Sequence, residues 1–284
     1  MAQIVMAYSA SHAPMMTADP GSAPREKADN FFSALEKVRD KAKETGVQAI
    51  VMMTGEHFTN FFLDGLPQIA IGLDEEHLGP PEVWLQVPKK MVPSHPGLAA
   101  HITASLVEQG HDPALSYGMK LDHGFMTVYY WLDRSMDLPM VPVVLNCTTP
   151  PLKTARQFYE FGVSMGKAIR SYEGLERVGL VAGGGLSHFV GEPRVGDIDE
   201  EFDHWFLELL AKGDLSPILD IPNDELMEAG NGTGEVRAWI ALAGAMNSAP
   251  GQVLAYEPVY EWINGMGVVL YDGDSAGAVP AGQA

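Results

Sequence analysis

The sequence predicts a single α/β domain in which a central mixed, largely parallel β-sheet is flanked by helices. Short apolar runs alternate with amphipathic helical segments over most of the 284 residues, which is the pattern of a sheet covered by helices on both faces. No linker or shift in composition divides the chain, and no internal repeat of fixed period occurs. Three of the apolar runs end in a turn of small residues and a histidine, which predicts a site at the C-terminal rim of the strands.

The first strand is expected at residues 3–8 and the second at residues 47–53, because both are short apolar runs. The segment 24–45 between them is expected to be a helix, with Phe31 and Leu35 at helical spacing and Gly46 as its stop. Another apolar segment covers residues 68–73, and further strands are expected at 113–118, 140–145, 178–182, 252–260 and 267–271. Further helices are expected at residues 96–109, 126–133, 152–172, 199–212, 223–229 and 236–243.

Two segments are expected to lie outside this regular core. Residues 74–96 are rich in proline and glycine, so they are expected to run over the surface with His77 and His95 exposed. The catalytic domain is expected to span residues 1–271, and the Gly-, Ala- and Ser-rich tail 272–284 is expected to be disordered.

Composition excludes several classes of protein. No apolar run approaches the length of about 20 residues that spans a bilayer, and the N-terminus lacks the features of a signal peptide. The single cysteine, Cys147, rules out an intrachain disulfide and a thiolate-bound metal cluster within one chain, and favours the cytoplasm. The formal charge of -19 argues against a nucleic-acid partner. An anionic substrate would need local basic groups, for which Lys120, Arg194 and Arg237 are candidates.

Histidines at the strand ends are the main candidates for chemistry. A lone histidine after a strand is usually structural, but His12, His57 and His188 occupy this position in three separate segments. Two imidazoles and one carboxylate can bind one face of Fe(II) and leave positions open for substrate and dioxygen. His12 and His57 are the natural imidazoles. Glu235, in a glycine-rich turn that opens a helix, is the best carboxylate, although an acid there also complements the helix dipole.

Other residues near these positions leave alternatives open. Glu56 is a rival metal ligand. His123 and His188 form a second pair that suits proton transfer near neutral pH, and Asp122 is a candidate to orient an imidazole. Five phenylalanines flank the functional positions and are expected to wall an aromatic pocket, although core packing explains each equally well: Phe58, Phe61, Phe62, Phe125 and Phe189.

Two common site classes do not match. The sequence has no P-loop, and Gly183-Gly-Gly185 is not the GxGxxG fingerprint of a dinucleotide site. Ser187 lacks the GxSxG spacing of a hydrolase nucleophile, because His188 follows it directly.

Five motifs together resemble the class III (LigB-type) extradiol ring-cleaving dioxygenases. They are Ser11-His12-Ala-Pro14, Glu56-His57-Phe-Thr-Asn-Phe-Phe62, Ser116-Tyr-Gly-Met-Lys-Leu-Asp122-His123-Gly-Phe125, Gly184-Gly-Leu-Ser-His188 and Asn231-Gly-Thr-Gly-Glu235-Val-Arg-Ala-Trp239. They span nearly the whole chain in the family's order. The resemblance implies Fe(II) held by His12, His57 and Glu235, with His123 and His188 as the acid and base around a bound catechol.

The resemblance also implies the reaction and the partners. The expected activity is meta cleavage of a catechol with O2, in which both oxygen atoms enter a ring-opened semialdehyde or keto acid. His188 is taken as the base and His123 as the acid, an assignment that could be reversed. A homo-oligomer is expected, and a small partner subunit is an open alternative. The competing interpretations are a 2-aminophenol- or gallate-type substrate, a zinc hydrolase and a non-catalytic relative.

Overall fold

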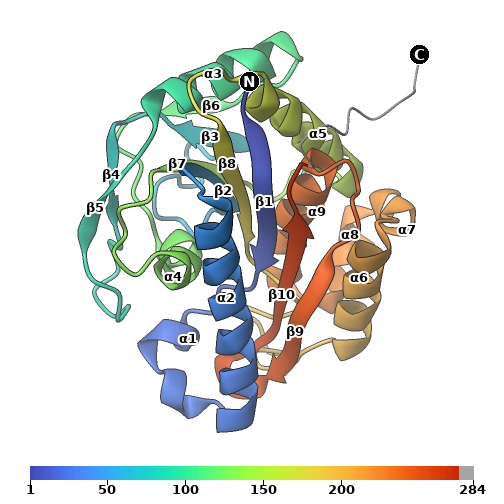
Figure 1. Cartoon of the computed structure of the whole chain (residues 1–284). Coiled ribbons are helices and arrows are strands. Elements are labelled where there is room, and N and C mark those ends of the chain that lie inside the picture. Colours follow the sequence, from blue (N-terminus) through green and yellow to red (C-terminus); the bar gives the residue numbers. More distant parts are fainter. Residues whose placement is uncertain (275–284) are drawn as a thin grey trace.

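The computed structural model describes residues 1–274, and within them an eight-stranded sheet carries helices on both faces (Figure 1). The strands lie in the order β6-β3-β7-β2-β8-β1-β10-β9. Their bounds are β1 (Gln3–Ala10), β2 (Ala49–Gly55), β3 (Ile69–Gly72), β6 (Ala114–Ser116), β7 (Met140–Leu145), β8 (Arg177–Gly183), β9 (Gln252–Val259) and β10 (Asn264–Asp272). The predicted α/β fold class is confirmed.

The centre of the sheet is parallel. β1 pairs with β8, β8 with β2, and β2 with β7, all in the parallel sense. The edges are mixed, because β10 is antiparallel to both β1 and β9, and β3 is antiparallel to β7 but parallel to β6. The register joins Ala10 to Gly183 and Met53 to Ala182. Three of the central strands therefore end at the same rim of the sheet.

Two hydrophobic clusters fill the space between the sheet and its helices. One face is covered by α3 (Pro96–Glu108), α5 (Ala155–Ser171), α6 (Glu200–Lys212) and α9 (Val236–Ala245). The other face is covered by α2 (Arg25–Thr45) and α4 (His123–Leu132). Because side chains of a strand alternate between faces, Val51 and Met53 enter the first cluster and Ile50 and Met52 the second. This two-sided burial explains why the central strands are apolar without interruption.

The segment 74–96 differs from expectation. It forms a two-stranded antiparallel ribbon of β4 (Glu76–Gly79) and β5 (Lys90–Pro93) instead of an irregular excursion. The predicted exposure of His77 is wrong, because this side chain is 1% exposed and its Nδ1 lies 3.0 Å from the carbonyl oxygen of Met119. The ring packs against Gly72, where a Cβ would lie 2.7 Å from it. His95 is half-buried and caps α3 by accepting a hydrogen bond from the backbone N–H of Leu98.

Smaller differences concern element ends. α4 starts at His123, three residues before the expected position. Short helices not expected as separate elements are α1 (Met15–Ala18), η1 (Pro20–Ser22), α7 (Ser216–Leu219), α8 (Asn223–Leu226), η2 (Met227–Ala229), η3 (Gly232–Glu235) and η4 (Tyr260–Trp262).

Ordered structure continues beyond the expected domain end at residue 271. Asp272 belongs to β10, and the carboxylate of Asp274 accepts hydrogen bonds from Arg170 and from the backbone N–H of Ile4. The rest of the expected tail, residues 275–284, lies outside the described residues. None of the helices within residues 1–274 is both long enough and apolar enough to cross a bilayer.

Candidate metal centre and active site

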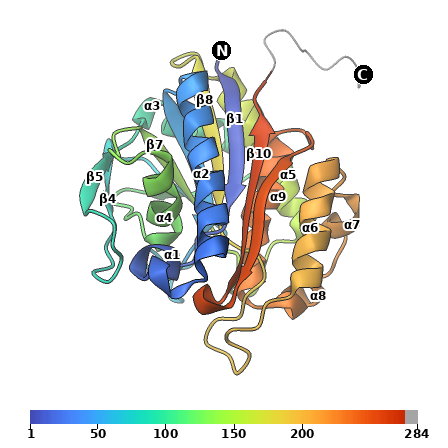
Figure 2. The ribbon, with the colours of Figure 1, turned by 60° about the horizontal axis from the view of Figure 1, so that its bottom comes forward.

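The predicted site residues meet at the C-terminal rim of the parallel strands. The loops after β1, β2 and β8 carry His12, His57 and His188, and the long loop after β8 projects from this side of the molecule (Figure 2). Glu235 approaches the same rim from the last residue of η3, directly before α9. The expected neighbourhood of the three strands is confirmed, since β2, β8 and β1 are consecutive in the sheet.

The carboxylate of Glu235 lies between the imidazoles of His12 and His57. Its Oε2 is 3.1 Å from His12 Nε2, and its Oε1 is 2.8 Å from His57 Nε2. The backbone N–H of Gly185 also donates to Oε2, at 2.9 Å. Ligand atoms about 2.1 Å from one ion and at right angles around it are about 3 Å apart. The three side chains are therefore spaced as ligands of a common ion.

The other nitrogen of each imidazole is held by a polar partner. His57 Nδ1 lies 3.0 Å from Asp122 Oδ2, and His12 Nδ1 lies 3.3 Å from Thr54 Oγ1. Asp122 also caps α4, where its side chain accepts from the backbone N–H of Gly124. Metal-binding histidines commonly donate their second N–H to such a partner, which fixes the tautomer and the ring. Asp122 thus orients His57, which is 65 positions away, and not its neighbour in sequence.

The charges of this cluster match a divalent cation. Burial would raise the pKa of Glu235, but the imidazoles of His12 and His57 outweigh burial and hold it well below its usual value. Burial would lower the pKa of His57, but Asp122 and Glu235 outweigh it and raise that pKa well above the usual value. If a metal displaces the proton that these carboxylates hold on His57, Asp122 and Glu235 carry a combined charge of about −2, which a divalent ion would balance. The donor set of two imidazoles and a carboxylate suits Fe(II).

A second group of possible ligands shares two of these residues. One nitrogen each of His12, His57 and His123 lie within 4.8 Å of one another. The ring of His123 is centred 4.2 Å from that of His57 and 5.7 Å from that of His12. Glu235 makes direct contacts of about 3 Å with both of the shared histidines, so it is the better third ligand by distance.

His123 and His188 are each bonded at Nδ1 as well. His123 Nδ1 is 2.9 Å from Glu82 Oε1, which also accepts from the backbone N–H of His123. His188 Nδ1 is 2.9 Å from the carbonyl oxygen of Leu186. A carbonyl can only accept, so Nδ1 of His188 carries the proton and Nε2 keeps its lone pair. Burial lowers the pKa of His188, which favours this neutral form.

A cavity of about 550 Å³ joins these side chains, a volume within the range of small-molecule sites. His12, His57, His123, His188 and Glu235 all line it. The rest of its wall consists of Ala13, Pro14, Glu56, Phe58, Thr148, Thr149, Val190, Asn231, Gly232, Trp262, Ile263 and Asn264. Gly232 is needed beside His188, because a Cβ there would lie 2.0 Å from His188 Nε2.

Of the five candidate phenylalanines, the structure brings only Phe58 to the cavity wall. Phe61 is partly buried against the second hydrophobic cluster. Phe62 is 54% exposed, and Phe125 is fully buried on α4 in the core. Phe189 is buried beneath the guanidinium of Arg194, which lies 4.0 Å from the centre of its ring. A phenylalanine that is next to a functional histidine in the sequence need not lie beside it in space, because successive side chains point in different directions.

Glu56 and Ser187 were the sequence's alternative candidates for a metal ligand and a nucleophile. Glu56, the rival ligand, directs Oε1 to the backbone N–H groups of Thr59 and Asn60, at 2.6 and 2.9 Å. Ser187 is fully buried, and its hydroxyl donates to Asp203 at 2.9 Å. Glu56 therefore supports the loop after His57 through Oε1. Ser187 is not presented to the cavity as a nucleophile.

Sequence reasoning missed Glu82 and the placement of Trp84. Both lie on the loop between β4 and β5, which reaches the site from the ribbon. Glu82 binds His123 as described, and the ring of Trp84 is centred 5.8 Å from that of His123. These residues sit in a proline-rich stretch without periodicity, so no local signal marked them.

The buried carboxyl group of Asp203 should make the stability of the protein depend on pH. Burial raises its pKa from 3.8 to about 7, although Ser187 and Tyr256 donate hydrogen bonds to it. Between pH 3.8 and about 7 the folded protein keeps a proton on Asp203 that the unfolded chain releases. The stability that this group contributes is therefore complete below pH 3.8 and is lost as the pH rises through about 7. The free energy of unfolding, measured with urea from about pH 4 to about pH 8, should therefore decline more in wild type than in Asp203→Asn. The exposed Asp224→Asn is the control, and equal pH dependence in wild type and Asp203→Asn would contradict this assignment.

Comparison with known proteins shows what the whole chain is similar to. Residues 6–271 match the family described as the catalytic LigB subunit of aromatic ring-opening dioxygenase. A 2,3-dihydroxyphenylpropionate/2,3-dihydroxicinnamic acid 1,2-dioxygenase of Photorhabdus laumondii is 26% identical, with 91% of this chain and 94% of the relative covered. A relative of the same name from Pseudomonas putida is 27% identical, with 88% and 91% covered.

A solved structure shows the same fold. An uncharacterized protein from Escherichia coli K12 superimposes with a TM-score of 0.57 over 94% of this chain and 99% of that chain. Its sequence is only 16% identical, so the likeness concerns the fold alone.

Proposed function

Since this chain belongs to the LigB family of aromatic ring-opening dioxygenases, we propose that it uses Fe(II) and O2 to cleave a catechol ring beside its two hydroxyls. The observation that carries this proposal is the convergence of His12, His57 and Glu235, with His123 and His188 on the same cavity. In this reaction both atoms of O2 enter the product, a ring-opened semialdehyde or keto acid.

We propose His12, His57 and Glu235 as the ligands of the iron. Bound Fe(II) would supply open positions for the catechol and O2 and would lower the pKa of a bound hydroxyl. Asp122 and Thr54 keep Nδ1 of the two imidazoles occupied, so Nε2 of each remains directed at the carboxylate. Asp122 and Glu235 together would balance the charge of a divalent ion, and both hold His57 in place.

His188 is proposed as the base that removes a phenolic proton. Its Nδ1–H is committed to Leu186, so Nε2 is the free acceptor, and a general base must hold such an acceptor within reach of the proton. His123 is proposed as the acid. The carboxylate of Glu82 beside its Nδ1 can stabilise the charge of an imidazolium, as a carboxylate does in a catalytic triad. Phe58, Trp262 and Ile263 line the same cavity and offer apolar surface to the ring.

Oxygen uptake tests the function. The protein would be reconstituted anaerobically with Fe(II), mixed with 2,3-dihydroxyphenylpropionate, protocatechuate, gallate, catechol or 2-aminophenol, and then exposed to air. Consumption of one O2 per substrate, with a new near-visible absorbance, would support catechol cleavage. Preference for gallate or 2-aminophenol would favour those alternative substrates. A protein that binds Zn²⁺ but gives no uptake when loaded with iron would favour the zinc hydrolase, because zinc is redox-silent.

Glu82 is expected to position His123. Glu82→Gln keeps the size of the side chain but removes the charge beside His123, so we expect kcat to fall about tenfold with little change in KM. Glu75→Gln, exposed on the same ribbon segment, should leave both constants unchanged. Equal losses in the two variants would show that the ribbon tolerates neither change and that Glu82 has no special role.

Location and assembly stay predictions of the sequence. A cytoplasmic enzyme is expected from the single cysteine. A homo-oligomer, with or without a small partner subunit, is expected from the resemblance to the family.

A further inference from the structure

The catalytic cavity offers no basic side chain to a substrate. Of the residues among 1–274 that line it, the acids are Glu56 and Glu235, and there is no lysine or arginine. The sequence of residues 275–284 contains no lysine or arginine either. Burying a carboxylate without a cationic partner is strongly unfavourable, so the wall of this cavity disfavours a carboxylated ring substituent.

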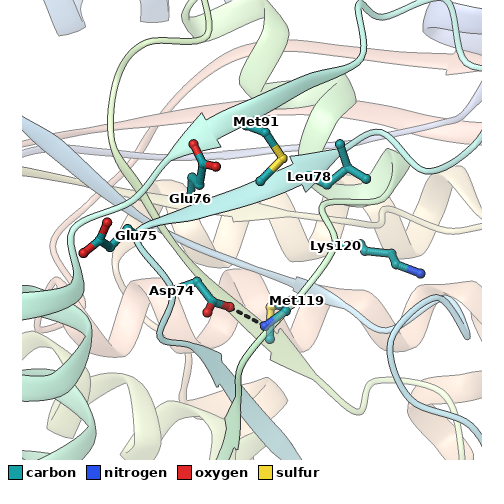
Figure 3. Close-up of a pocket in the computed structure, with 8 residues that line it drawn as sticks. Asp74, Glu75, Glu76, Leu78, Met91, Met119 and Lys120 are labelled. Atoms are coloured by element: carbon teal, nitrogen blue, oxygen red, sulfur yellow. Dashed lines mark hydrogen bonds between the residues drawn. The ribbon is translucent and has the colours of Figure 1, made fainter.

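The three basic residues that could have paired with an anionic substrate lie elsewhere. Lys120 lines a separate pocket of about 500 Å³, together with Asp74, Glu75 and Glu76 (Figure 3). The guanidinium of Arg194 lies over the ring of Phe189 and bonds Asp197.

Arg237 is close to Glu235 in sequence but is turned into the core. It is fully buried, and its Nη1 donates to the carbonyl oxygens of Cys147 and Gly234, while Nη2 donates to Asn223. Both terminal nitrogens of Arg237 therefore already donate hydrogen bonds within the protein, and Arg237 does not line the cavity.

Two acceptor atoms on residues that line the cavity have no hydrogen-bond partner among the described residues. Glu56 Oε2 and Asn264 Oδ1 belong to side chains that are 8% and 3% exposed, and neither atom has a hydrogen-bond partner among the described residues. Asn264 uses its Nδ2 to donate to the carbonyl of Gly185, which fixes Oδ1 as the free acceptor. Neither acceptor can pair with a carboxylate, which offers acceptors only.

A bound divalent ion would not leave surplus positive charge in the cavity. Asp122 and Glu235 would match its charge, and Glu82 adds a further carboxylate beside His123. An anionic substituent would therefore enter a site without surplus positive charge, next to apolar Phe58, Val190 and Trp262.

We propose that the substrate of this enzyme is a catechol whose ring substituent is uncharged, such as an alcohol or an amide, and not a carboxylate. The inference rests on the proposed ring cleavage and names its substrate class. It separates this chain from the two relatives described above, whose printed names specify carboxylic acids.

Matched substrates that differ only in charge test the proposal. The first pair is 2,3-dihydroxyphenylpropionate and its primary amide, and the second is protocatechuate and its primary amide, so that two ring positions are sampled. With the Fe(II)-loaded protein we expect kcat/KM to be about tenfold or more higher for the amide in the pair that is cleaved. A kcat/KM for the acid equal to or above that of the amide in any pair that is cleaved would overturn the inference.

A charge placed in the wall provides a second test. Val190 is 55% exposed and lines the cavity, so Val190→Arg should fold, with Val190→Gln as the neutral control of similar reach. Val190→Arg should raise kcat/KM for the acid relative to the amide by about tenfold compared with Val190→Gln. No change in this ratio would show that wall charge does not select the substrate.

The outcomes distinguish this inference from the proposed function. If none of the four compounds, unsubstituted catechol or 3-methylcatechol consumes O2 although iron is bound, the proposed function itself fails. If catechols are cleaved and the acids are preferred, ring cleavage stands and only the inference about charge is wrong.

Discussion

Glu235→Gln should abolish iron binding and ring cleavage while leaving the fold intact. The substitution keeps the shape of the side chain but removes the charge that lies 3.1 Å from His12 and 2.8 Å from His57. A neutral amide cannot match a divalent ion, so we expect kcat/KM at fixed Fe(II) to fall by about three orders of magnitude. Oxygen uptake and iron content after gel filtration would measure the two losses.

Thermal unfolding separates this effect from a damaged fold. A ligand that binds only the native state raises the melting temperature, so Fe(II) under anaerobic conditions should stabilise wild type and not Glu235→Gln. The control is Glu228→Gln, an exposed acid on η2 close to Glu235 in sequence, which should behave as wild type. Full iron content in Glu235→Gln would contradict its assignment as a ligand and would favour the three-histidine group with His123.

His188→Ala should lose catalysis but keep the metal. Removal of a general acid or base costs about 10²- to 10⁴-fold in rate, and none of the contacts between Glu235 and its two histidines involves His188. We therefore expect a loss of kcat in this range with iron content unchanged. The exposed His204→Ala, whose side chain packs on Tyr256 away from the cavity wall, is the control.

Comparison with His123→Ala assigns the two proton-transfer roles. If His188 is the base, His188→Ala should alter the ultraviolet spectrum of catechol bound anaerobically, because the phenolic proton is no longer removed. His123→Ala should leave that spectrum unchanged and fail only after O2 is admitted. The opposite pattern would exchange the two roles, and wild-type rates in both variants would remove both residues from the mechanism.

The sequence by itself determined the parallel core and most of the residues at its rim. Uninterrupted apolar runs such as Ile50–Met53 are typical of strands buried on both faces, and strands that alternate with helices usually pair in parallel. Their C-terminal ends must then share one edge. Local order along the chain therefore predicted that His12, His57 and His188 would lie together, and the described fold confirms this neighbourhood. The motif resemblance added Glu235 and His123 to the candidate set.

Only the tertiary structure decided which loops and side chains meet at that rim. Glu235 is 178 positions from His57 yet lies 2.8 Å from it. Asp122 holds His57 and not the adjacent His123, and Glu82 arrives on a ribbon that the sequence represented as a surface loop. The basic residues that the sequence offered to an anionic substrate are directed elsewhere. The physical reason is that a local pattern reports periodicity and strand ends, whereas side-chain contacts depend on strand order, helix crossings and the direction of each side chain.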